Sequence, residues 1–430
     1  MIRSLVAAAA ALLLTASTGA QDTDEAVIVI HAGWLLAVPG EAPEAEQSIV
    51  IRGERIDRIE DGYVEIDGAT VIDLSSQYVL PGLIDSHVHL LSELNPNRRL
   101  QNVTFSSADW ALDGVRNARS TLMAGFTSVQ DVGGELEAIV ALRDAVRDGD
   151  VIGPRMRVSG PAVTPTGGHG DANGYNQDIL HLIGSESACN GPADCRRAVR
   201  ELIRARVDLI KITATGGVLS QTAAGTEQQF FDDELESIME AARMMGRYVT
   251  AHAHGVGGIN SAIRAGVHSI EHGSYLDDES IRLFRDNGVY LVPTLLAGAT
   301  VAEIAETANW MTPEVRQKSI EVGPQMLDMA RRAHTGGVQI AFGTDSGVSR
   351  HGDNAREFPL LVEAGLTPME AIVSATVTAS EHIQMADAIG TIEPGKFADI
   401  IATDENPWED VSALLDVDFV MQGGQVHKNQ

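Results

Sequence analysis

The middle of the chain alternates between short apolar runs and longer amphipathic stretches. A short apolar run is typical of a buried strand, whereas an amphipathic helix repeats its apolar residues every three or four positions. Eight apolar runs occur between positions 79 and 347, separated by helical patterns such as 231–246. Alternating strands and helices imply β/α units around a parallel sheet, and eight units predict a (β/α)8 TIM-like barrel. The expected strands are VLPGLIDSHVHL (79–90), TSVQDVG (127–133), MRVSG (156–160), DLIKITA (208–214), RYVTAHAH (247–254), HSIEHG (268–273), VYLVPTL (289–295) and VQIAFGTDSG (338–347).

The two ends of the chain have a different pattern. Residues 26–78 read as short strands rich in β-branched residues, and residues 399–427 repeat this texture. We therefore expect one small β-sandwich domain assembled from both termini, comprising residues 21–80 and 392–430. The catalytic barrel would then occupy residues 81–391.

The first twenty residues follow the pattern of a secretory signal peptide. Arg3 supplies the positive region, Leu5 to Leu14 form the apolar region, and Thr18, Gly19 and Ala20 provide a small-residue cleavage site. The apolar run is too short to cross a bilayer, which takes roughly 20 residues, and no later segment is long and apolar enough. We expect an exported protein, periplasmic or secreted, without a membrane span.

Charge narrows the range of partners. The formal net charge of −29 argues against nucleic acids and anionic membrane surfaces, because both would repel the chain. An anionic small substrate remains compatible with this charge, provided that its site carries local positive charge.

The two cysteines of the chain, Cys189 and Cys195, lie in the stretch ACNGPADC. Export permits a disulfide, and the intervening Asn-Gly-Pro favours a turn that brings the cysteines together. We expect a local disulfide, because no neighbouring histidine supports a zinc site.

Polar residues occur where the expected barrel strands end. His87 and His89 are two positions apart, so they point to the same side of a strand. Chemistry in such barrels lies at the carboxyl ends of the strands. Imidazole and carboxylate groups are common zinc ligands. The candidate metal ligands are His87, His89, Lys211, His252, His272 and Asp345.

Lys211 distinguishes one kind of metal site from another. An ammonium group repels a divalent cation and is a poor ligand while it is protonated. Reaction with carbon dioxide would convert the lysine into a carbamate, whose two oxygens can bridge two metals. The alternative is a structural lysine paired with a carboxylate.

These residues also carry a family resemblance. PGLIDSHVHL, the lysine of the fourth strand, the later histidines and GTDSG resemble the metal-dependent amidohydrolase superfamily. Within it, residues 351–376 and 389–407 resemble the prolidase-like, imidazolonepropionase-related branch. That branch includes carboxypeptidases that act on N-acyl amino acids and dipeptides, and enzymes that hydrolyse the amide of ochratoxin A.

The resemblance implies two divalent metal ions, with zinc as the first choice and manganese and cobalt as alternatives. His87, His89 and Asp345 would bind one metal, and His252 and His272 the other, with carboxylated Lys211 bridging them. Asp345 would also be the catalytic base and then the acid. His254 would lie outside the ligand set.

Substrate contacts are expected from the loops after the strands. The glycines around His169 would bring the backbone close to a ligand, so His169 is the first candidate contact. Tyr275 follows the sixth strand and could hydrogen-bond the substrate or equally cap the packing. Arg350 and His351 follow the eighth strand at the barrel mouth, where Arg350 is either a partner for a substrate carboxylate or a solvated charge. The segment 217–230 is rich in small and polar residues, which suits a lid.

The predicted function is hydrolysis of an amide or peptide bond next to a free terminal carboxylate, as in a carboxypeptidase or dipeptidase. Ochratoxin A, cleaved to ochratoxin alpha and phenylalanine, is one such substrate. The alternatives are a one-metal deaminase or cyclic-amide hydrolase, a lactonase and a non-enzymatic scaffold. A one-metal site has no use for a bridging carbamate, and a decayed scaffold would be expected to lose ligands. The family resemblance also leads us to expect a homo-oligomer.

Overall fold

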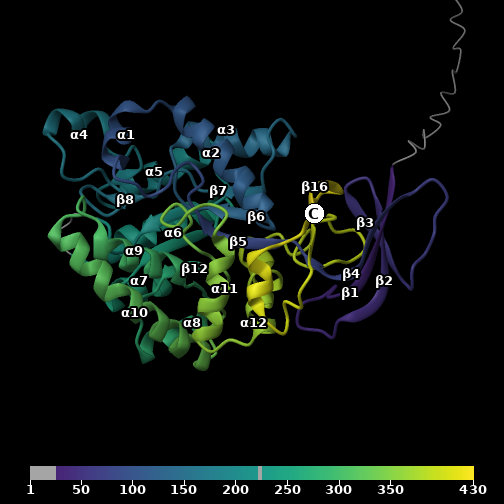
Figure 1. Ribbon diagram of the computed structural model, residues 1–430. Coiled ribbons are helices and arrows are strands. Elements are labelled where there is room, and N and C mark those ends of the chain that lie inside the picture. Colours follow the sequence, from purple (N-terminus) through teal and green to yellow (C-terminus); the bar gives the residue numbers. More distant parts are fainter. Residues whose placement is uncertain (1–25, 221–224) are drawn as a thin grey trace, which may run out of the picture.

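Strands from both ends of the chain form one mixed sheet beside a larger α/β body (Figure 1). The structure is a computed structural model that describes residues 26–220 and 225–430. Only the β1–β4 pair of this sheet is parallel. The prediction of a small β-domain built from both termini is confirmed. Its strands, in spatial order, are β16 (Gln425–Asn429), β15 (Phe419–Gln422), β14 (Ile400–Thr403), β4 (Thr70–Pro81), β1 (Val27–Leu35), β2 (Glu44–Arg52) and β3 (Arg55–Asp61).

This sheet bends over its own apolar core. The start of β3 pairs with the segment before β14, where Ile56 N donates to Lys396 O at 3.0 Å. The side chains enclosed in this way include Ile30, Ile49 and Phe419, all fully buried. The expected sandwich is therefore one continuous sheet whose inner face is packed against itself.

The barrel strands run parallel and form a closed ring. The sheet β5–β6–β7 joins the sheet β10–β11–β12–β13 through a bridge between Val163 and Ile212. The ring closes through bridges from Leu291 to Ile340 and from Val88 to Ser346. These connections confirm the TIM-like barrel. Its regular strands are β5 (Leu83–Val88), β6 (Phe126–Asp131), β7 (Arg155–Val158), β10 (Ile210–Thr213), β11 (Val249–Ala253), β12 (Ser269–His272) and β13 (Tyr290–Val292).

The eighth expected strand, residues 338–347, pairs only through single bridges. Its backbone bonds to β13, where Ala341 N donates to Leu291 O at 3.0 Å, and to β5, where Ser86 N donates to Phe342 O at 2.9 Å. It also bonds to groups other than the backbone of these two strands. Phe342 N donates to Ser374 O at 2.9 Å, and Thr344 N donates to Oδ1 of Asp85 at 3.1 Å. The backbone of Asp345 then turns to a φ of 57°, which ends the extended conformation. This turn leaves the Asp345 side chain at the mouth of the barrel.

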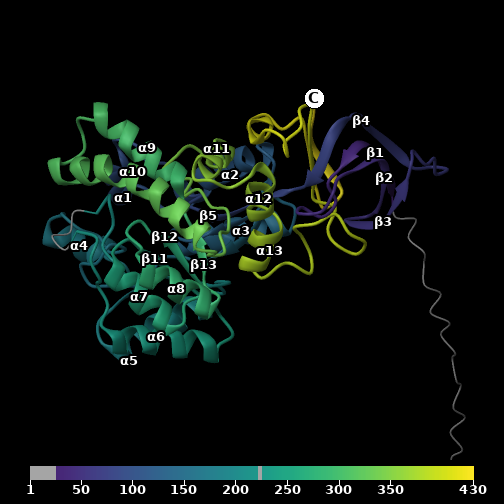
Figure 2. The same ribbon diagram turned by 90° about the horizontal axis from the view of Figure 1, so that it is seen from below.

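Helices surround the barrel strands, as Figures 1 and 2 show from two directions. In α6, Leu235, Ile238 and Ala242 are buried at spacings of three and four residues, as the sequence predicts for an amphipathic helix. The helices are α1 (Arg98–Thr104), α2 (Ser107–Met123), α3 (Leu136–Arg147), α4 (Gln177–Ile183), α5 (Pro192–Arg204), α6 (Asp232–Met244), α7 (Val256–Ala265), α8 (Asp278–Asn287), α9 (Leu295–Thr307), α10 (Pro313–Thr335), α11 (Glu357–Glu363), α12 (Pro368–Ser374) and α13 (Val377–His382).

A disulfide joins the short strand β9 (Ala188–Cys189) to the first turn of α5. Its two cysteines, Cys189 and Cys195, are fully buried. β9 pairs with β8 (Thr164–Pro165), so the disulfide ties α5 to the loop that contains His169. Among the described helices, none combines the length and apolarity needed to cross a membrane.

The passage from the small sheet into the barrel requires a glycine at position 82. A Cβ at this position would lie 2.2 Å from Oγ1 and 2.8 Å from Cβ of Thr127. Gly82→Ala is expected to lower the free energy of unfolding by about 1–3 kcal/mol, because the clash involves atoms close to the backbone. Thermal denaturation measures this effect. Thr127→Ala, tested alone and combined with Gly82→Ala, should recover part of the loss; an unchanged midpoint in the single Gly82→Ala variant would contradict the steric argument.

Candidate metal centre

A cavity of about 790 Å³ lies at the carboxyl ends of the barrel strands. Side chains from β5, β10, β11, β12 and the 338–347 segment reach its wall. All of the predicted metal ligands line this one cavity: His87, His89, Lys211, His252, His272 and Asp345. The structure therefore brings together residues that are up to about 260 positions apart in the sequence.

His87, His89 and Asp345 form the first group of donor atoms. Oδ1 of Asp345 lies 3.1 Å from Nε2 of His89 and 3.5 Å from Nε2 of His87. This oxygen is buried and makes no hydrogen bond of acceptable geometry with the described residues. A buried carboxylate oxygen left in this state indicates a missing cationic partner.

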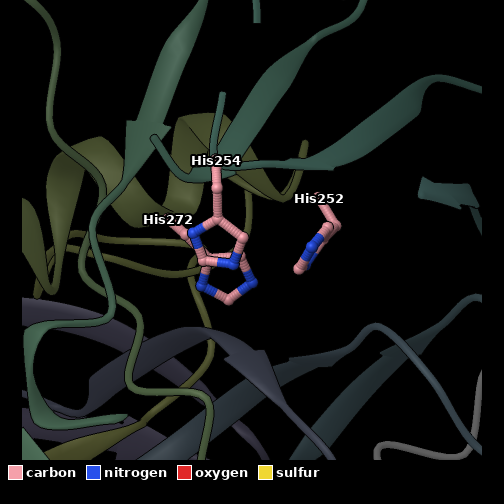
Figure 3. A group of neighbouring side chains, drawn as sticks. All are labelled: His252, His254 and His272. Atoms are coloured by element: carbon pink, nitrogen blue, oxygen red, sulfur yellow. The ribbon is translucent and has the colours of Figure 1, made fainter. Parts of the chain in front are cut away.

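His252, His254 and His272 form the second group, shown in Figure 3. One ring nitrogen from each lies within 4.8 Å of the others. The rings of His254 and His272 are stacked, with centroids 4.9 Å apart, and the His252 ring stands edge-on to them. His272 also forms a donor group with His87 and Asp345, so the two groups are adjacent. His254, expected outside the ligand set, lies within this cluster, and its Nδ1 is 2.7 Å from Oγ of Ser274.

The hydrogen bonds of the first two histidines define which ring nitrogen is free. Nδ1 of His87 lies 2.6 Å from a carboxylate oxygen of Glu271, and Nδ1 of His89 lies 2.8 Å from the Gly133 carbonyl. A carbonyl or carboxylate oxygen only accepts, so each Nδ1 carries the hydrogen. In the neutral ring Nε2 then keeps its lone pair, and in both residues Nε2 faces Asp345. This is the arrangement that metal-binding histidines have.

His272 has the same tautomer for a less direct reason. Its Nδ1 lies 2.7 Å from Oγ1 of Thr294, and that hydroxyl donates its one hydrogen to Pro293 O at 2.8 Å. The hydroxyl must therefore accept from His272, so Nδ1 is protonated and Nε2 is left free. Glu271 and Thr294 were absent from the predicted site. Only the position of Glu271, directly before His272, pointed to it in the sequence.

Lys211 is buried as the second residue of β10. Within the described part of the chain, its amino group makes no hydrogen bond or ion pair. Burial lowers the pKa of Lys211, against the opposing effect of Glu271, Asp345 and Asp131. A buried amine without a bonding partner is costly for a residue that serves only structure.

Burial also sets the charge of the surrounding groups. It lowers the pKa of His252 and His272 well below the usual value, and neighbouring imidazoles add to this effect. Burial alone would raise the pKa of Asp345, but His87 and His89 bring it well below its ordinary range. Burial alone would lower the pKa of His87, but Asp345 and Glu271 raise it. The neutral imidazoles of His252 and His272 and the ionised carboxylate of Asp345 are donors that divalent cations bind. The residues therefore fit a metal centre.

The sequence profile of the Amidohydrolase family matches residues 78–428. The chain belongs to the amidohydrolase family. Ochratoxinase from Aspergillus niger is 32% identical over 437 residues, which cover 94% of this chain and 88% of the ochratoxinase. A solved Xaa-Pro dipeptidase with methionine bound in its active site has a TM-score of 0.90 at 39% identity, covering 94% of this chain and 100% of that one. Imidazolonepropionase from Streptomyces griseus is 26% identical over 375 residues, covering 84% and 86% of the two chains.

This membership confirms the predicted family, its hydrolase class and its barrel fold. In this amidohydrolase, His169, the first candidate for a substrate contact, lines the cavity. Its ring is stacked on that of His252 with centroids 4.2 Å apart, and its buried Nδ1 has no hydrogen-bond partner among the described residues. Burial lowers the pKa of His169 to about 4.

The other expected substrate contacts lie elsewhere in the amidohydrolase. Tyr275, Arg350 and His351 are outside the set of described residues that line the cavity. Arg350 is exposed, Tyr275 is half-buried, and His351 bonds through Nε2 to the Ser92 carbonyl at 3.1 Å. Of the expected lid, residues 221–224 lie outside the described part of the chain. Residues 218–220 line the cavity, and Nζ of Lys318 donates to the Gly217 carbonyl at 2.8 Å.

Thr294 gives a test of the histidine orientation in this amidohydrolase. Thr294→Val keeps the shape of the side chain but removes the acceptor for Nδ1 of His272. Metal affinity is expected to fall about 10- to 100-fold, because the ring is no longer held in its tautomer and orientation. Titration with a competing chelator measures this change. Thr121→Val is the matched control: the Thr121 hydroxyl in α2 is also buried but makes no hydrogen bond, so this variant should keep the wild-type affinity. Equal affinities in all three proteins would refute the role of Thr294.

Proposed function

We propose that this amidohydrolase uses two metal ions to cleave the amide or peptide bond next to a terminal carboxylate, in N-acyl amino acids or dipeptides. The observation that carries the proposal is the position of Lys211. This buried, unpartnered lysine lines the same cavity as two adjacent groups of metal-ligand atoms. Conversion of this lysine to a carbamate would give it two oxygens that can bind a pair of cations.

We assign His87, His89 and Asp345 to one metal, and His252 and His272 to the other. The carbamate formed from Lys211 and carbon dioxide would bridge them. His254 is placed beside the second metal, where its bond to Ser274 orients it. Zinc is our first choice because imidazoles predominate among the donors, although manganese and cobalt accept the same ligands.

The bound cations would supply an acidified water molecule and a polarised scissile carbonyl. The chain itself supplies the proton transfers. Asp345 takes a proton from the attacking water as the general base, while its Oδ1 faces the metal-binding histidines. Asp345 then delivers the proton to the leaving nitrogen, so that the amide becomes a carboxylic acid and an amine. Because Asp345 first accepts and then releases one proton, its carboxylate is regenerated at the end of each cycle.

The substrate class is supported by the related proteins and by the size of the cavity. A cavity of about 790 Å³ lies within the range for small-molecule sites. The similar proteins include a Xaa-Pro dipeptidase, an ochratoxinase and a prolidase complexed with N-methylphosphonate-L-proline, the last with a TM-score of 0.85 at 33% identity. Hydrolysis of ochratoxin A to ochratoxin alpha and phenylalanine fits the same bond type.

We also propose that the protein is exported and self-associates. The disulfide between Cys189 and Cys195 supports export, because such bonds persist in oxidising compartments. Self-association is supported by large apolar side chains on the adjoining helices α1 and α4, where Leu100 is 60% exposed and Leu182 is 84% exposed.

Replacement of Lys211 tests the two-metal site. Lys211→Ala is expected to lose at least one metal equivalent and most of the activity, because no carbamate can form. Metal analysis by mass spectrometry and turnover measurements provide the readouts. Lys211→Arg is the matched control for charge: it keeps a cation but cannot carry the carbamate, so it should fail in the same way. Full metal content with normal turnover in either variant would rule out the bridging role.

A turnover screen of the metal-replete protein tests the reaction. N-acyl amino acids, Xaa-Pro, Xaa-Arg and Xaa-Phe dipeptides and ochratoxin A are expected to include substrates with a kcat/KM above about 10⁴ M⁻¹s⁻¹. Lactones and cyclic amides serve as the comparison set, since a lactonase or an imidazolonepropionase-like enzyme would prefer them. Activity confined to that comparison set would overturn the proposed substrate class.

A further inference from the structure

A second cationic side chain reaches the cavity from outside the metal cluster. Arg98, at the start of α1, lines the cavity with its guanidinium over the Trp110 ring, 4.9 Å from the ring centroid. Its Nη1 is buried without a hydrogen-bond partner. Throughout residues 26–220 and 225–430, no side chain or backbone group forms a hydrogen bond or ion pair with this guanidinium.

The acidic residues that share the cavity wall are bonded to other groups. Glu135 accepts the Ala138 backbone N–H at 2.7 Å, as the N-cap of α3. Glu93 accepts the His351 N–H at 2.9 Å, and Asp171 accepts the Gly167 N–H at 2.8 Å. Asp345 faces the histidines of the metal cluster. None of these carboxylates neutralises Arg98.

The neighbouring arginine differs from Arg98 in this respect. Arg99 donates from Nη2 to the Gly174 carbonyl at 2.7 Å and lies over the Tyr175 ring at 4.3 Å. Arg350, the arginine expected from the sequence to meet a carboxylate, is exposed and lies outside the cavity wall. Arg98 is therefore the arginine of the cavity wall whose bonding groups remain available.

Arg98 is half-buried, and a guanidinium whose Nη1 is enclosed without a partner costs free energy that an anionic ligand would offset. Burial lowers the pKa of Arg98, but a guanidinium keeps its charge at any physiological pH. Its planar donors match the two oxygens of a carboxylate. Gly133, whose carbonyl orients His89, lines the same cavity as Arg98 and Trp110. The cavity that holds the metal cluster therefore also reaches the arginine.

We infer that Arg98 binds the terminal carboxylate of the substrate and so selects substrates with a free acid over their neutral analogues. This inference rests on the proposed amide hydrolysis and names the residue that recognises the leaving amino acid. Trp110 supports the guanidinium from below and forms an apolar wall beside the carboxylate.

The test compares one acid with its amide. For the N-acyl amino acid that is hydrolysed fastest and for its C-terminal carboxamide, kcat/KM is measured in the wild type and in Arg98→Met, which keeps the apolar stem. The acid is expected to lose about 100-fold and the carboxamide less than about threefold, so that the preference for the acid disappears. Arg98→Lys should retain part of the preference. Arg116→Met is the control for charge, because Arg116 is exposed on α2 and paired with Asp113.

Thermal unfolding separates recognition from structure. The Arg98→Met protein should unfold at the same temperature as the wild type or at a higher one, because the change removes a half-buried charge that pairs with none of the described residues. An unchanged preference for the acid, or equal losses for both substrates with a lowered unfolding temperature, would overturn the inference and leave the proposed reaction standing.

If the wild type hydrolyses neither compound, the proposed reaction fails. In that case, calorimetry measures the binding of N-acetyl-phenylalanine and of its carboxamide to the wild type and to Arg98→Met. Tighter binding of the acid by the wild type, lost in Arg98→Met, supports the role of Arg98. Equal binding of the two compounds by the wild type refutes this role.

Discussion

The buried carboxylate of Asp85 holds the seam at which the barrel closes. It accepts hydrogen bonds from Thr344 N at 3.1 Å, Thr344 Oγ1 at 2.6 Å and Asn354 Nδ2 at 2.7 Å. Burial raises the pKa of Asp85 to about 6 in spite of these donors. At the same seam, Asp345 N donates to the His87 carbonyl at 2.7 Å. The first and last parts of the barrel are joined at the point where both supply donor atoms, so ring closure and assembly of the site are one event.

A second layer of buried polar groups keeps the donor atoms in position. Asp131 accepts hydrogen bonds from Leu90 N at 2.7 Å and Gly133 N at 3.2 Å, and the Gly133 carbonyl then accepts from His89. Glu271, which accepts from His87, is itself bonded to Ser269 at 2.9 Å. In a medium of low dielectric constant such bonds are strong when they are all satisfied. The imidazoles are therefore oriented before any metal or substrate arrives.

The local part of this architecture was predictable from the sequence, because it depends on periodicity. The alternation of apolar runs and helical patterns predicted the barrel, and polar residues at strand ends predicted which side chains would meet. Contacts between distant segments could not be predicted in the same way. The sequence pointed to Arg350 as a substrate contact and gave no reason to single out Arg98, yet it is Arg98 that lines the cavity, with its guanidinium over the Trp110 ring. The 338–347 segment has the composition of a strand and bonds to both β5 and β13, but Phe342 N and Thr344 N donate to Ser374 and Asp85, which interrupts regular strand pairing.

Backbone conformation gives an independent indication of where function is concentrated. Six non-glycine residues have positive φ in the described part of the chain, and three of them lie around the cavity: His272 at 71°, Thr294 at 51° and Asp345 at 57°. Each costs of order 1 kcal/mol or more, and β-branched Thr294 is an especially unfavourable residue for this region. Each also directs a polar side chain at the end of a barrel strand into the metal cluster or onto one of its histidines. In a regular strand, alternate residues point to opposite faces. The side chains of these three residues would then not be directed at the metal cluster. The backbone strain therefore results from turning the ends of three successive strands toward one point. The hydrogen bonds to Asp85 and those between the barrel strands hold the backbone in this strained conformation.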